Sequence, residues 1–145
     1  MISIFIPLLL QVGLTLILMP MVARLRTKEI KATPGLFKKA ALDNKVYSDN
    51  ALKIANNYDN QFQLPVLFYV ACLLALMSGT TGVLAGIFAW GFVLSRIGHT
   101  IIHTTTNNLL RRFQTFALGL TLLIGFWTVV AIGVINSPLL TKVSP

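Results

Sequence analysis

The sequence predicts an all-α protein that crosses a lipid bilayer as a transmembrane four-helix bundle. Hydrophobic residues make up 55% of its 145 residues and charged residues only 11%, against roughly 25% charged residues in an average soluble domain. The apolar residues fall into four runs with polar connections between them. The Lys and Arg residues gather in the first and third connections, as they do in the cytoplasmic loops of membrane proteins.

The four apolar runs define the spans, at about residues 2–23, 60–78, 82–104 and 113–135. The first run is long enough to cross a bilayer as a helix. We interpret it as an uncleaved span, because no basic residue precedes it and no small-residue cleavage site follows it. The second run, residues 64–77, is too short alone and needs helix from the polar stretch before it. We expect one domain over residues 1–145.

The connections predict the orientation of the chain. The first connection carries eight basic residues: Arg24, Arg26, Lys28, Lys31, Lys38, Lys39, Lys45 and Lys53. Arg96, Arg111 and Arg112 lie in or beside the third connection, whereas the second, Ser78-Gly79-Thr80-Thr81-Gly82, is an uncharged tight turn. The positive-inside rule therefore places both basic connections in the cytoplasm and both termini outside it.

Within the first connection, Thr33-Pro34-Gly35 predicts a turn. From about Asp43 the sequence suits a helix, with Asp43 or Ser48 as its N-cap. We expect this helix to run straight into the second span.

The formal net charge of +8 does not indicate a nucleic-acid-binding protein, because the basic residues lie in loops between membrane spans. The expected surroundings of the chain are membrane lipids. The single cysteine, Cys72, lies inside an apolar run, where we expect it to be inert.

Polar residues inside membrane helices are costly, so their placement is informative. Two sets recur at steps of three and four residues, which places each set on one helical face. The first set is Lys53, Asn56, Asn60 and Gln63. The second set is Arg96, His99, His103, Asn107 and Arg111. Both lie at the cytoplasmic ends of their helices, where we expect them to line one shared cavity.

Each set also has a purely structural interpretation. The amides of Asn56, Asn60 and Gln63 can join helices or subunits by hydrogen bonds. One of Arg111 and Arg112 can simply extend toward lipid phosphates. His99 and His103 are spaced for metal binding, but no third ligand is evident, so we predict no metal site. Tyr58 and Tyr69 fit interfacial or packing roles better than catalytic ones.

The functional interpretation takes the two sets as one site. Imidazoles, amides and a guanidinium facing a partly enclosed cavity suit an anionic ligand with several acceptors. A nearby Arg also lowers the pKa of a bound thiol, because fixed positive charge favours the thiolate.

Two segments resemble the MAPEG family, the membrane-associated proteins in eicosanoid and glutathione metabolism. Asn56-Asn57-Tyr58-Asp59-Asn60-Gln61-Phe62-Gln63-Leu64-Pro65-Val66-Leu67-Phe68-Tyr69 is similar to the start of the family's second helix. A later set is similar to the third and fourth helices of its bacterial branch: Arg96, His99, His103, Asn107, Arg111, Phe116 and Gly119.

The resemblance implies a homotrimer in a bacterial inner membrane, with glutathione as cosubstrate bound between subunits near the cytoplasmic face. It implies transfer of glutathione to a hydrophobic electrophilic small molecule, or reduction of a lipid peroxide. Arg111 best matches the family's thiol-activating Arg, with an offset of one residue. Glutathione contacts are implied for Lys53, Asn56, Asn60, Gln63, Arg96, His99, His103 and Asn107.

The chain departs from the family's pattern on the second helix. Asn56, Asn60 and Gln63 stand where an Arg/Asn/Glu set grips the peptide, so two charge-assisted contacts are missing. Lys53, one turn earlier, supplies part of the lost charge. His99 and His103 stand where tyrosines are usual.

Two functions therefore compete. The first is a glutathione-dependent transferase or peroxidase. The alternative is a non-catalytic membrane protein that binds an anionic lipid or uses both polar sets for assembly. A transporter has little support, because inverted repeats and broken helices are not evident in the sequence.

Overall fold

The computed structural model describes residues 2–138, and these residues are all-α, as the sequence predicts. The long helices are α1 (Ile2–Ala32), α4 (Leu64–Ser78), α5 (Val83–Thr104) and α6 (Leu109–Ile135). Between α1 and α4 lie α2 (Leu36–Ala40), the 3-10 turn η1 (Asn44–Val46), α3 (Asp49–Asp59) and the 3-10 turn η2 (Asn60–Phe62). Four helical stretches are long and apolar enough to cross a membrane, which confirms the predicted fold class: Ile4–Ala32, Asp49–Ser78, Val83–Thr104 and Leu109–Ile135.

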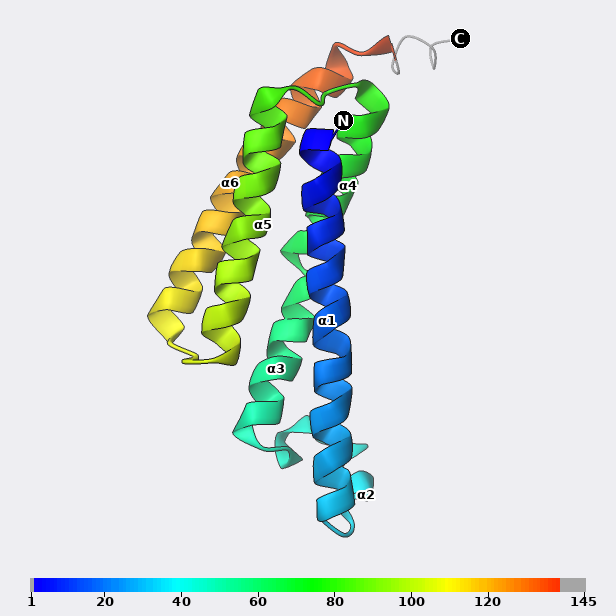
Figure 1. Ribbon diagram of the computed structural model, residues 1–145, viewed down its shortest axis with the longest axis vertical. Helices are drawn as coiled ribbons and strands as arrows, with labels where there is room; N and C mark the ends of the chain where they lie inside the picture. Colours follow the sequence, from blue (N-terminus) through cyan, green and yellow to red (C-terminus); the bar gives the residue numbers. More distant parts are fainter. Residues whose placement is uncertain (1, 139–145) are drawn as a thin grey trace.

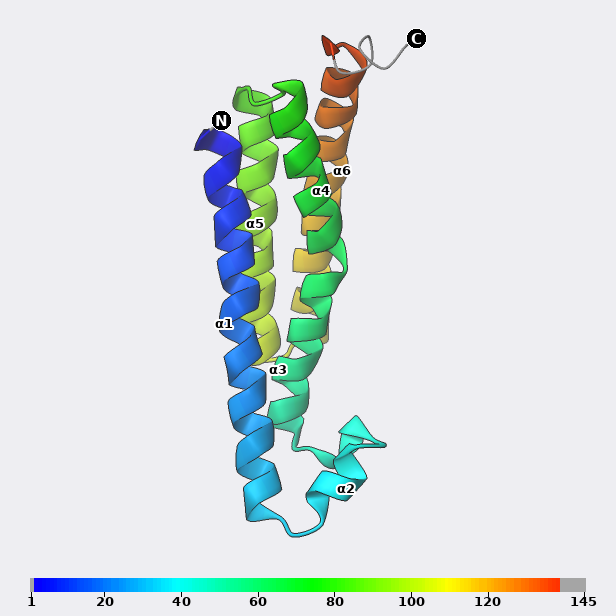
Figure 2. The ribbon, with the colours of Figure 1, turned by 90° about the vertical axis from the view of Figure 1, so that its right-hand side faces the viewer.

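The helices form an elongated bundle whose two ends differ (Figure 1). The start of α1, the turn between α4 and α5 and the end of α6 lie at one end, whereas α2 lies at the other. Helix α5 packs on both α1 and α6, α4 packs on α6, and α3 packs on α1 and α5. Figure 2 shows α3 and α4 following one another alongside α1. The two basic connections therefore lie on the side of the bundle away from the start of α1.

An apolar core holds the half of the bundle that contains α4. The ring of Phe68 stacks on that of Phe92 at 4.6 Å and lies 5.8 Å from that of Phe126. All three rings are fully buried, and Cys72 is buried in the same core. Large apolar side chains also cover the outside: Leu16, Ile17, Leu73 and Leu94 are each more than half exposed. A surface of this kind requires lipid as its surroundings.

Helices α5 and α6 approach closely at glycines of α6. A Cβ added to Gly119 would lie 2.7 Å from Ser95 Oγ, and one added to Gly125 would overlap the ring of Phe88. Small residues permit such close helix packing in membranes. The start of α6 is thereby held against the polar residues of α5.

Helix α1 continues nine residues beyond the apolar run that ends at Ala23. Its extension is stabilised by a second, smaller cluster, in which Leu25 and Ile30 pack against Leu36, Tyr47 and Ala51. The Arg26 guanidinium lies 5.0 Å from the centre of the Tyr47 ring. These contacts explain why this charged stretch stays helical.

The extension also positions α3. Ser48 is the N-cap of α3, since its hydroxyl accepts a hydrogen bond from the Ala51 amide at 3.3 Å. The Glu29 carboxylate accepts hydrogen bonds from both the amide and the hydroxyl of Ser48. Asp43, the other predicted cap, instead accepts from the Lys45 amide and caps η1. The polar loop thus fastens the start of α3 to α1.

The prediction that this helix runs straight into the second span was wrong. Helix α3 ends at Asp59, η2 follows, and α4 begins only at Leu64. The cause is Pro65, which has no amide hydrogen and whose ring clashes with the backbone one turn earlier. Gln63, with φ −102° and ψ −106°, takes up the change of direction.

Candidate functional site

The third and fourth spans meet at a row of buried polar residues on α5. Arg96, His99 and His103 are 0%, 3% and 1% exposed. Their steps of three and four residues place them on one face of α5, which packs against α3 and α6. Buried polar groups need partners, so the neighbours of this row define the site.

Asn60 joins the row to the break between α3 and α4. Its side-chain Nδ2 lies 3.4 Å from His103 Nδ1, and its backbone carbonyl accepts a hydrogen bond of 3.4 Å from Arg96 Nη2. The helix break matters here, because it exposes the Asn60 carbonyl to a side chain of another helix. The two predicted polar sets therefore do meet, at Asn60.

The other residues of the first predicted set, Lys53, Asn56 and Gln63, lie on either side of the break between α3 and α4. Lys53 and Asn56 line a cavity with His103, whereas Gln63 is exposed and lines none of the described cavities. The break turns Gln63 away from the face that Asn56 and Asn60 share. Its predicted contact with the ligand has no geometric support within one chain.

A buried chain of amides supports η2 from behind. Gln11 Nε2 donates to Gln61 Oε1 at 2.9 Å, and Gln61 Nε2 donates to the Asn57 carbonyl at 3.1 Å. The Thr100 hydroxyl donates to Asn57 Oδ1 at 3.4 Å. This network links α1, η2, α3 and α5 and was not predicted from the sequence. Gln11, an isolated amide in the first apolar run, is the sequence feature that could have indicated this network.

The start of α6 adds Arg112 to the site. Asn107 takes a left-handed backbone conformation, with φ +52°, and Asn108 caps α6 by accepting from the Arg111 amide at 3.0 Å. Arg112 Nη1 donates to Asn107 Oδ1 at 2.9 Å. His99 Nδ1 donates to the Arg112 carbonyl at 3.1 Å. Arg112 is thus held at both its side chain and its backbone.

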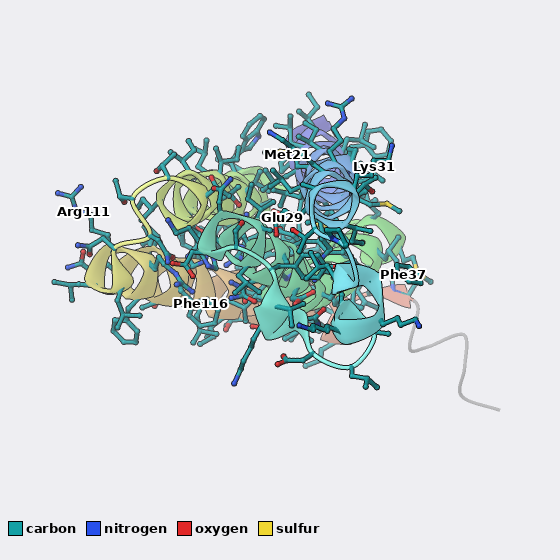
Figure 3. All side chains as sticks on the ribbon, turned by 90° about the horizontal axis from the view of Figure 1, so that it is seen from below. Met21, Glu29, Lys31, Phe37, Arg111 and Phe116 are labelled. Atoms are coloured by element: carbon teal, nitrogen blue, oxygen red, sulfur yellow. The ribbon has the colours of Figure 1, made fainter. Side chains whose placement is uncertain are left out.

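Arg111 points the other way. Its side chain is exposed, and Figure 3 shows it at the outer edge of the molecule, directed away from the other helices. No described cavity includes it. The spacing along α6 indicates that Arg112, rather than Arg111, faces α5. Arg112 is seven residues before Gly119, so both residues share the helical face that packs on α5.

Two cavities open beside these residues, and Arg112 lines both. A polar cavity of about 190 Å³ is lined by Asp49, Leu52, Lys53, Asn56, His103, Asn107 and Arg112. A more apolar cavity of about 200 Å³ is lined by Asn60, His99, Leu109, Arg112, Phe113 and Phe116. The two cavities therefore adjoin at Arg112, which lines both. They also adjoin at the contact between His103 of the polar cavity and Asn60 of the apolar cavity.

Several buried donors at this site have no partner among residues 2–138. They are Nε and Nη1 of Arg96 and Nε of Arg112. His99 Nε2 also has no partner among these residues, whereas its Nδ1 donates to the Arg112 carbonyl. Among residues 2–138 no carboxylate neutralises Arg96, whose one hydrogen bond goes to the Asn60 carbonyl, and Arg96 lines neither cavity, whereas Arg112 lines both. Such a site has capacity for an anionic or strongly polar ligand.

Other candidate groups do not join the site. Within residues 2–138, no group of three or more His, Cys, Asp or Glu side chains is arranged to hold a metal ion. Tyr58 packs edge-on against Phe62, and the Tyr69 hydroxyl lies 3.4 Å from that of Thr15. Cys72 is buried in the apolar core.

Comparison with known proteins agrees with the four-helix architecture. The model of the MAPEG family matches residues 4–132. Neither a curated protein nor a solved structure matches the chain. Since the family match extends over most of the sequence and includes every residue of the site, the protein belongs to the MAPEG family.

Proposed function

We propose that the protein is a glutathione-dependent membrane enzyme, a transferase or peroxidase that acts on hydrophobic electrophiles. The observation that supports this most directly is the position of Arg112, whose side chain lines both a polar and an apolar cavity. An enzyme that joins a charged peptide to a lipid-soluble molecule needs this arrangement. Membership of the MAPEG family agrees with it.

The polar cavity suits glutathione, a peptide with two carboxylates, an ammonium group and a thiol. Lys53 and Arg112 supply positive charge, and Asn56, His103 and Asn107 supply further hydrogen-bonding groups. Arg112 Nε also has no partner of its own among the described residues. Charge-assisted hydrogen bonds from such groups are about twice as strong as neutral ones.

Arg112 replaces Arg111 in the proposed chemistry. A guanidinium beside a thiol favours the thiolate, which is the reactive form. Arg112 is fixed for this task by Asn107 at its Nη1 and by His99 at its carbonyl. Asn60, held by His103 and Arg96, completes the wall between the two cavities. Positioned groups of this kind lower the barrier to reaction by orienting the reactants.

The apolar cavity suits the second substrate. Leu109 and Phe113 at its edge are 76% and 67% exposed, so the cavity opens to the lipid side of the bundle. A hydrophobic molecule dissolved in the membrane then reaches Arg112 without passing through water. Leu109 and Phe113 lie in the first turns of α6, close to the basic connection.

The position of the site suggests its surroundings in the cell. We propose a bacterial inner membrane, with the basic connections in the cytoplasm and both termini outside it. We also propose a homotrimer, which the family resemblance implies. In that assembly a neighbouring chain covers the polar cavity and leaves the apolar cavity open to lipid, and Gln63 faces that neighbour.

The test is the ultraviolet absorbance of a thiolate when glutathione is added to the purified protein in detergent. We expect the signal in the natural protein and its loss in Arg112→Met, with Arg111→Met as the matched variant. If the thiolate signal is lost in Arg111→Met and kept in Arg112→Met, Arg111 would be the residue that activates the thiol. The absence of detectable glutathione binding at millimolar concentration would overturn the proposal. Disturbed oligomers in Asn60→Ala or His103→Ala would then favour the non-catalytic alternative.

A further inference from the structure

The polar cavity contains a carboxylate whose role the proposed function does not explain. The chain has four Asp and Glu residues in all. Glu29, on α1, accepts hydrogen bonds from Ser48, and Asp43 accepts one from the Lys45 amide in the loop that precedes α3. Asp59 lines none of the described cavities. Asp49 is therefore the one carboxylate at the site.

Asp49 lies beside a positive charge without pairing with it. Asp49 and Lys53 are four residues apart on α3, and both line the cavity, so they share one helical face. No Lys, Arg or His nitrogen of the described chain lies within 4.0 Å of the Asp49 carboxylate oxygens. Two opposite charges about one helical turn apart are thus left for a ligand.

The pattern of charge identifies the kind of ligand group. An α-amino acid end carries an ammonium and a carboxylate on one carbon, so a neighbouring anion and cation in the protein complement both. Asn56, one turn beyond Lys53, adds an amide to the same face. Arg112 comes from α6 and remains for the thiol. A ligand with carboxylates alone would meet repulsion at Asp49.

We infer that Asp49 and Lys53 bind the zwitterionic amino-acid end of the thiol cosubstrate, so that the enzyme selects peptides with a free α-amino group. Asp49 accepts hydrogen bonds from the ammonium, and Lys53 pairs with the adjacent carboxylate. This inference rests on the proposed function, and it makes Asp49 a residue that determines specificity. It also supplies a carboxylate in place of the one that is missing from the set of Asn56, Asn60 and Gln63.

The experiment compares two ligands by titration calorimetry: glutathione, and glutaryl-cysteinyl-glycine, which lacks only the α-amino group. We expect the natural protein to bind glutathione at least about tenfold more tightly, the effect of one hydrogen bond to a charged group. Asp49→Asn should reduce the ratio of the two affinities to near one. Because the ratio is measured within each variant, it does not depend on how much of the variant is folded.

Three further variants serve as controls. Asp59→Asn removes a carboxylate from the same helix and should keep the full preference for glutathione. Asp49→Glu should keep much of it. Lys53→Met should weaken both ligands by a similar factor, since both retain the carboxylate.

The outcomes separate this inference from the proposed function. Equal affinities in the natural protein, or an unchanged preference in Asp49→Asn, would overturn the role of Asp49 and leave a glutathione site in place. If the natural protein binds neither ligand, the proposed function fails and the inference fails with it.

Discussion

At the scale of single residues, the site depends on how Asn60 connects two helices. Its side chain contacts His103, and its carbonyl accepts from Arg96. Substitution of the side chain removes the first contact and leaves the second, because the carbonyl belongs to the backbone. The two contributions can therefore be measured separately.

We expect Asn60→Ala to weaken glutathione binding roughly two- to tenfold, the effect of one net hydrogen bond, with little change in stability. Titration calorimetry measures the affinity, and circular dichroism checks the fold. Asn50→Ala is the control, since Asn50 is exposed in the first turn of α3 and lines none of the described cavities. Equal losses in both variants would show that Asn60 has no specific role.

Residue spacing predicted part of the site. The spacing placed Arg96, His99 and His103 on one face, because one continuous helix carries all three. Spacing alone did not favour Arg112 over Arg111 as the proposed thiol-activating residue, because the left-handed conformation of Asn107 resets the helical phase between α5 and α6. Asp49 was missed because it is separated from the polar stripe of α5 by more than forty residues and meets it only in the folded chain.

At the scale of helices, the break between α3 and α4 is the feature that the sequence analysis failed to predict. Pro65 was visible in the sequence, but an X-Pro pair inside a helical pattern permits either a kink or a full interruption. The extension of α1 beyond Ala23 was also missed, since it depends on contacts with Leu36 and Tyr47 across the loop. Hydropathy located the apolar runs well because bilayer thickness sets their length.

The hydrogen bond between Gln11 and Gln61 should hold η2 in place. We expect Gln11→Leu and Gln61→Leu each to destabilise the protein by about 1 kcal/mol, because each leaves the other amide buried without its partner. The double variant should cost less than the sum, as interacting residues do. Unfolding in mixed detergent measures all three changes. Strict additivity of the two single changes would contradict a direct interaction.

At the scale of the whole molecule, the bundle has an apolar end and a polar end. The Phe68, Phe92 and Phe126 core fills the first, and the paired cavities around Arg112 occupy the second. The polar cavity and the basic connections lie on the same side, so in the orientation that we propose a charged cosubstrate would reach the site from the cytoplasm. The lipid-facing cavity would receive the hydrophobic substrate from within the bilayer.

The central claim is that Arg112 joins a cytoplasmic glutathione site to a lipid-facing site, and turnover in sealed membrane vesicles tests it most directly. Glutathione does not cross the bilayer, so it is added outside either inverted or right-side-out vesicles that contain a hydrophobic electrophile. We expect conjugate to form only in inverted vesicles, with at least about a hundredfold loss in Arg112→Met, the scale of one electrostatic catalytic group. Absence of conjugate in inverted vesicles, or equal rates in the natural protein and Arg112→Met, would contradict the account.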